Sequence, residues 1–175
     1  LMPDKVLEIG PGPGIFKNIA LRFGIDVETF DSDPELMPDH VGSATALPFD
    51  DNAYDVVCAF QMLEHLPYEE SLLAFKEMVR VSKRYVVISL PDAGAAWTYS
   101  FYLPKFGLYE LLIQRPTVKK EVHKFDGEHY WEVNKKGYAL DKVTGDLERF
   151  CRLIKTYRVH QNPYHRFFIF TLIEN

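Results

Sequence analysis

The feature of this sequence that most restricts its fold is a glycine-rich turn close to its start. Lys5–Ile9 has the pattern of a short buried strand, and Gly10–Gly14, with the sequence Gly-Pro-Gly-Pro-Gly, follows at once. A helix is predicted next, with Ile15, Ile19 and Phe23 on one side. A strand that passes through glycines into a helix is typical of α/β proteins whose backbone closely approaches a ligand.

The same alternation continues along the chain. Further strands are predicted at 26–30, weakly near 41, at 55–60 and at 84–90, with a helix at 68–81. The strands are continuously apolar, which indicates a parallel sheet covered on both faces. A helix is expected over 138–150. Two β-rich runs, 151–159 and 166–173, flank a turn and should pair in the antiparallel sense.

Composition sets the broad class. The chain has 175 residues, 47% hydrophobic and 26% charged, which favours one globular domain spanning 1–175. No apolar run approaches the ~18 residues of a membrane-spanning helix, and no signal peptide is recognised. The two cysteines, Cys58 and Cys151, form no disulfide framework, and Cys58 is expected in the core. An intracellular, cytoplasmic location fits this pattern.

The net charge of −5 argues against generic binding to duplex nucleic acid. The charge is uneven, because basic residues outnumber acidic ones over 115–160. That segment is interpreted as a solvated face, with an anion site as the less favoured alternative. A nucleic-acid partner is disfavoured but stays open.

Two acidic residues near the glycine loop indicate the kind of ligand. Glu8 ends the first strand, where a carboxylate disfavours pyrophosphate and favours a cationic or polyhydroxylated ligand. Asp31 ends the second strand, where a carboxylate can accept both hydroxyls of a ribose. The dinucleotide fingerprint G-x-G-x-x-G is incomplete, because its last position here is Ile15. The residues therefore favour nucleoside recognition without phosphate.

Residues 3–91 resemble the class I S-adenosylmethionine-dependent methyltransferases, in particular the type 11-like domain. The first strand and glycine loop correspond to the first motif of that family, and Asp31 to its acidic end of strand two. The other matching segments are Gly42–Phe49, Asp51–Val57, Phe60–Leu66, Val79–Val81 and Tyr85–Pro91.

The resemblance implies an α/β, Rossmann-like, doubly wound fold. Its mostly parallel seven-stranded sheet has helices on both faces and a C-terminal antiparallel hairpin. The implied cofactor is S-adenosylmethionine, with S-adenosylhomocysteine as product. Gly10 and Gly12 would face the methionine part, Asp31 the ribose and Ala44 the adenine. The implied cofactor-binding set is Glu8, Gly10, Pro11, Gly12, Asp31, Ser32, Ser43, Ala44, Leu47 and Gln61.

One position departs from the family pattern. Many members have an acid where this chain has Ser43, and a hydroxyl accepts a weaker hydrogen bond from the adenine amino group. Relatives also carry a helix or more before the first strand, so a covering N-terminal segment is expected to be missing.

The acceptor is expected near residues 92–132, as a lid or insertion after the fifth strand. The aromatic run 97–115 is interpreted mainly as a lid helix packed on the sheet, or else as a wall around an apolar acceptor. His129, Tyr130 and Trp131 are the substrate candidates, with His129 as a possible base and packing or surface roles equally open. No metal site is expected, because the six histidines form no HExxH pattern and no pairing with cysteine.

The leading functional interpretation is methyl transfer from S-adenosylmethionine to an unidentified acceptor, most simply a small molecule. Two alternatives stay open. One is an NAD-dependent oxidoreductase on the same fold plan, which the missing glycine and Glu8 disfavour. The other is a non-catalytic cofactor-binding scaffold or sensor, which Ser43 slightly favours.

Overall fold

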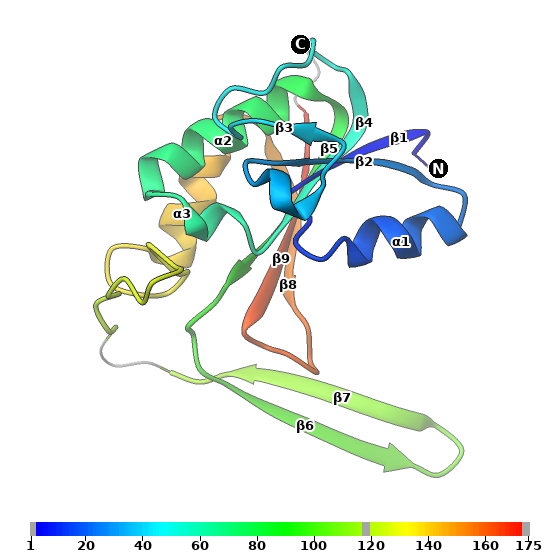
Figure 1. The fold of residues 1–175 in the computed structure, drawn as a ribbon. Coiled ribbons are helices and arrows are strands. Elements are labelled where there is room, and N and C mark those ends of the chain that lie inside the picture. Colours follow the sequence, from blue (N-terminus) through cyan, green and yellow to red (C-terminus); the bar gives the residue numbers. More distant parts are fainter. Residues whose placement is uncertain (1–2, 117–119, 173–175) are drawn as a thin grey trace.

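The fold is built around one open sheet of seven strands (Figure 1). A computed structural model describes residues 3–116 and 120–172. The strand order is β3-β2-β1-β4-β5-β9-β8, and β9 alone runs antiparallel to its two neighbours. The predicted doubly wound, mostly parallel sheet with a terminal antiparallel pair is confirmed. The strands are β1 (Lys5–Ile9), β2 (Asp26–Asp31), β3 (His40–Val41), β4 (Tyr54–Phe60), β5 (Ser82–Pro91), β8 (Arg152–Arg158) and β9 (His165–Thr171).

Helices lie on both faces of this sheet, as predicted (Figure 1). α1 (Ile15–Arg22) covers one face, and α2 (Tyr68–Val81) with α3 (Leu140–Leu147) covers the other. Two single 3₁₀ turns, η1 (Pro34–Leu36) and η2 (Leu63–His65), follow β2 and β4. No helix among the described residues combines the length and the apolar character needed to cross a membrane. The predicted end of the last strand at Ile173 lies outside the described residues.

The larger part of the core lies between the sheet and α2. Phe75, Met78 and Val81 are completely buried and lie in the same cluster as Val86 and Ile88 of β5. Their i, i+3 spacing places them on one side of the helix. Because each such side chain contributes about 1.5–3 kcal/mol when buried, this layer holds β4 and β5 in place.

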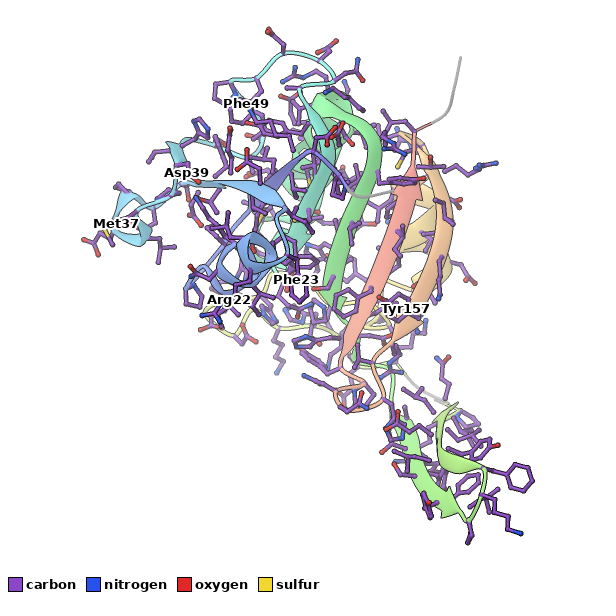
Figure 2. All side chains as sticks on the ribbon, turned by 90° about the vertical axis from the view of Figure 1, so that its right-hand side faces the viewer. Arg22, Phe23, Met37, Asp39, Phe49 and Tyr157 are labelled. Atoms are coloured by element: carbon purple, nitrogen blue, oxygen red, sulfur yellow. The ribbon has the colours of Figure 1, made fainter. Side chains whose placement is uncertain are left out.

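The α1 face is only partly covered. Phe16 and Ala20 pack on the sheet, whereas the predicted apolar stripe faces solvent: Ile15 is 62% exposed, Ile19 52% and Phe23 70%. The apolar spacing predicted the helix correctly, and this stripe lies on the side of α1 that faces solvent. Figure 2 looks onto this face, and Arg22 and Phe23 on α1 lie in front of the first strands. Among the described residues, no helix covers β5, β9 and β8 on this side.

The aromatic segment after β5 is a hairpin, so the predicted lid helix was wrong. β6 (Ala96–Leu103) pairs with β7 (Gly107–Gln114) in a separate two-stranded sheet that projects from the body (Figure 1). The reason is visible in the sequence, because aromatic residues alternate with small polar ones and such a period of two favours a strand. The register places seven apolar residues on one face of the hairpin, called here its apolar face: Trp97, Tyr99, Phe101, Leu103, Tyr109, Leu111 and Ile113.

Candidate functional site

A cavity of about 490 Å³ opens at the carboxyl ends of β1, β2 and β4. This is the edge where ligands bind in open parallel sheets. Its volume lies within the ~300–1,000 Å³ range of small-molecule sites. Seven residues of the predicted cofactor set line it: Gly10, Gly12, Asp31, Ser32, Ser43, Ala44 and Gln61.

The glycine loop forms one wall because its backbone adopts a left-handed conformation. Gly10 has φ 70° and its N–H donates to the Phe30 carbonyl, at 2.9 Å. Gly12 has φ 50°, and a Cβ built there would meet no atom within 4 Å. The backbone at Gly12 therefore faces open space in the cavity, where a ligand can approach it closely.

Asp31 and the turn after β3 form another part of the cavity lining. One carboxylate oxygen of Asp31, Oδ1, accepts the N–H of Asp33 at 2.9 Å. Ser43 Oγ is 2.8 Å from the Thr45 hydroxyl and also accepts the Thr45 N–H at 3.3 Å. The Ser43 hydroxyl is thus already engaged within its own turn.

Gln61 lines the cavity directly after the end of β4. Its φ of 53° is uncommon for a residue with a side chain. Two hydrogen bonds to Ser89 of β5 hold it there, from the Gln61 N–H to the carbonyl oxygen at 3.0 Å and from Nε2 to Oγ at 3.1 Å. A strained residue that its surroundings fix in this way is typical of a ligand site.

Three residues of the predicted set do not line the cavity. Pro11 is buried in the loop, and its carbonyl accepts the Gly14 N–H at 2.9 Å. Leu47 is buried in the core beneath the site. Glu8 is buried in β1; burial raises its pKa to about 7, partly offset by the backbone N–H and the charge of Lys17. One Glu8 oxygen, Oε2, makes no hydrogen bond within the described part of the chain.

A second group of polar side chains lies beside this cavity, where η2 meets the loop 126–132. His65 lines the cavity, and its ring meets that of His129 at a centroid distance of 5.1 Å. Glu64 is completely buried, and burial together with the nearby charge of Glu132 raises its pKa to about 8. His129 was predicted from the sequence, whereas Glu64 and His65 were not, although an acidic and a basic residue shortly after a buried strand were a signal.

The three predicted substrate residues have different surroundings. His129 is mostly buried, with Nδ1 3.6 Å from Glu132 Oε1. Tyr130 is exposed, and its backbone N–H donates to the Glu64 carbonyl at 2.9 Å. Trp131 is buried in the core and packs edge-on against Tyr68, with centroids 4.9 Å apart. The ring of His129 contacts that of His65, which lines the cavity.

A larger hollow of about 840 Å³ lies at the base of the hairpin. Arg115, Lys120 and Lys135 line it, so part of the basic segment gathers there, and Lys135 forms an ion pair with Glu121 at 2.9 Å. Neither the glycine loop nor Asp31 lines this hollow. The residues predicted to bind a nucleoside therefore line the smaller cavity.

Comparison with known proteins agrees with this geometry. Residues 7–88, which include the end of β1, the glycine loop, Asp31, Gln61 and most of β5, match the family model described as a methyltransferase domain. This segment, slightly under half of the chain, is similar to that domain, which agrees with the predicted methyltransferase family.

Individual relatives of the methyltransferase domain are distant. An uncharacterized methyltransferase of Mycobacterium sp. (strain JLS) is 32% identical over 118 residues, 61% of this chain and 42% of the relative. The matched region therefore spans less than half the length of this curated relative.

Two solved structures share the fold. The PH0226 protein of Pyrococcus horikoshii OT3 has a TM-score of 0.67 at 15% identity, over 99% of this chain and 83% of that one. The 1,6-didemethyltoxoflavin-N1-methyltransferase of Burkholderia thailandensis, with 1,6-didemethyltoxoflavin and S-adenosylhomocysteine bound, has a TM-score of 0.63 at 12% identity, over 99% and 72%. At these identities, the likeness concerns the fold.

Proposed function

We propose that this chain transfers a methyl group from S-adenosylmethionine to a small-molecule acceptor. The observation that carries the proposal is the cavity whose walls unite the left-handed glycine loop, Asp31 and the Ser43–Ala44 turn. The match of residues 7–88 to the methyltransferase domain model supports it. So does the fold shared with a methyltransferase that has a small acceptor and S-adenosylhomocysteine bound.

The residues in the cavity fit this cofactor. Asp31 has a second carboxylate oxygen beyond the one that accepts the Asp33 N–H, and this oxygen can accept ribose hydroxyls. The open space at Gly12 leaves room for a methionine moiety against the backbone. Behind the loop, Glu8 carries a buried carboxyl oxygen without a hydrogen bond in the described structure, which a positively charged ligand would compensate.

The chain's own residues mainly position the reactants. When bound, S-adenosylmethionine supplies a methyl group activated by its positively charged sulfur, so the protein needs no nucleophile of its own. Gln61, fixed by Ser89, and the glycine loop would orient this group toward the acceptor. Such alignment is a large source of rate enhancement in itself.

Thermal unfolding with S-adenosylmethionine, S-adenosylhomocysteine and NAD in parallel tests the proposal. A ligand at about 100 times its dissociation constant stabilises the folded state by ~2.7 kcal/mol. We expect protection by both adenosyl compounds and none by NAD. Protection by NAD alone would favour the oxidoreductase alternative.

Asp31→Ala and Asp26→Ala form a matched pair for this experiment. Both residues lie on β2, but Asp26 is at the end away from the cavity and is exposed. Asp31→Ala should lose the protection and Asp26→Ala should keep it. Equal protection in the two variants would contradict the proposed site. Turnover with pools of small acceptors then separates an enzyme from a scaffold that only binds the cofactor.

A further inference from the structure

The buried carboxyl group of Glu64 has no hydrogen-bond or ion-pair partner among the described residues. The side chain is 0% exposed, and neither carboxylate oxygen makes a hydrogen bond within the described residues. No lysine or arginine of the described chain lies within ion-pair distance of it. A buried carboxylate normally has hydrogen bonds, a paired cation or a bound metal, so this group points to a missing partner.

Two imidazole rings lie next to this carboxylate. One ligand atom from each of Glu64, His65 and His129 falls within 4.8 Å of the others. Two ligands of one zinc ion, each ~2.1 Å from it, lie at most ~4.2 Å apart, so small side-chain movements bring these three into range. The Nδ1 of His129 is also buried without a hydrogen bond in the described structure.

The ring of His65 is oriented for such a role. Its Nδ1 lies 3.1 Å from the Glu128 carbonyl oxygen. A carbonyl can only accept, so Nδ1 carries the hydrogen and the lone pair of the neutral ring is on Nε2. Metal-binding histidines are commonly held in this way, by a hydrogen bond from the other ring nitrogen to a backbone carbonyl.

Further carboxylates surround His129. Glu132 Oε1 lies 3.6 Å from its Nδ1, and Asp126, His129 and Glu132 form a second set with ligand atoms within 4.8 Å. The loop that carries them is fixed to η2 by the hydrogen bond from the Tyr130 N–H to the Glu64 carbonyl. The cluster therefore brings carboxyl oxygens and imidazole nitrogens together at one place.

We propose that Glu64, His65 and His129 bind one divalent cation of the zinc or manganese class at the wall of the cofactor cavity. Two imidazoles with a carboxylate suit such ions, whereas magnesium and calcium prefer oxygen ligands. This departs from the expectation drawn from the histidine spacing, because the ligands come from two segments far apart in the sequence.

One consequence concerns the acceptor and rests on the proposed function. His65 lines the cavity, so a cation bound there lies at its wall. A divalent cation polarises an oxygen bound to it and lowers the pKa of a bound hydroxyl. We therefore expect acceptors that carry a hydroxyl or carbonyl oxygen close to the methylated atom.

Calorimetric titration tests the cation site directly. Protein treated with EDTA and then dialysed is titrated with zinc, manganese and magnesium chloride. We expect one equivalent of zinc or manganese per chain, bound more tightly than magnesium. Glu64→Gln and His129→Gln should weaken this binding about 10-fold or more. His160→Gln, which changes a histidine near the hairpin, is the matched control and should leave it unchanged.

Two outcomes would overturn the inference: no stoichiometric binding to the wild type, or undiminished binding to Glu64→Gln. Circular dichroism verifies the fold of each variant. If Glu64→Gln does not fold, His65→Gln provides the same test at a less buried position. Titration of the same samples with S-adenosylhomocysteine separates the two proposals. Cofactor binding without cation binding would overturn the cation site alone, and Asp31→Ala should lose the cofactor and keep the cation.

Discussion

Gly10 and Met62 approach each other so closely that a Cβ on Gly10 would lie 2.5 Å from the Cγ of Met62. The contact joins the glycine loop to the segment that follows β4. No side chain other than hydrogen fits at residue 10 unless Met62 moves, and Met62 itself lines the cavity.

Gly10→Ala should therefore destabilise the protein more than Gly24→Ala. Both positions have positive φ, 70° and 75°, which costs an alanine about 1–2 kcal/mol. A Cβ on Gly24 meets no atom within 4 Å, whereas on Gly10 it clashes with Met62 and adds about 1–3 kcal/mol. Urea unfolding measures both free energies, and equal losses would show that the contact is unimportant.

Glu8→Gln should remove a pH dependence of stability. The pKa of Glu8 is raised from 4.5 to about 7 by burial, so the folded state retains a proton that the unfolded chain releases. The contribution of Glu8 to stability therefore falls as the pH rises from about 4.5 to about 7, and is then constant. Urea midpoints from pH 5 to pH 8 should show Glu8→Gln gaining on the wild type as the pH rises. Parallel curves would contradict this.

Trp131→Ala should unfold the protein far more easily than Tyr130→Ala. Trp131 is buried against Tyr68, and loss of such a ring costs about 3–5 kcal/mol. Tyr130 is exposed, and its truncation should change the free energy of unfolding by no more than about 0.5 kcal/mol. The same urea measurements decide this. A small loss for Trp131→Ala would argue for a substrate role in place of packing.

The apolar face of the hairpin should promote self-association. Tyr99 and Leu111 lie opposite each other on that face, both about half exposed, and exposed apolar patches favour contacts between molecules. The double substitution Tyr99→Ser with Leu111→Ser should lower the mass measured by light scattering at high protein concentration. Thr98→Ser with Leu112→Ser alters the other face as a control. The same effect from both pairs would exclude a role for this face.

The sequence predicted the parts of the fold that depend on local pattern. Val57 and Ile88 lie in continuous apolar runs, and such runs between turn residues define buried parallel strands. The glycine loop and Asp31 were also predictable, because their chemistry and spacing are both local. Seven of the ten predicted cofactor residues line one cavity for this reason.

The remaining features depend on contacts that no local pattern contains. Glu64 and His129 come together because a loop far along the chain packs on η2. The apolar stripe of Ile15, Ile19 and Phe23 indicates a helix, but only tertiary packing decides that this stripe stays in solvent. The hairpin was predictable from the alternation around Tyr99, but its many aromatic residues were interpreted as a lid.

The position of β9 has a consequence for how the chain acquires its structure during synthesis. β9 (His165–Thr171) lies between β5 and β8, so the edge of β5 has no partner until residues 165–171 have left the ribosome. The pairing of Val87 with Ile169 joins positions far apart in sequence, and such long-range pairing is slow. A nascent chain carrying β1 to β5 thus exposes an unpaired apolar strand, which makes this interval the one in which a chaperone would be needed.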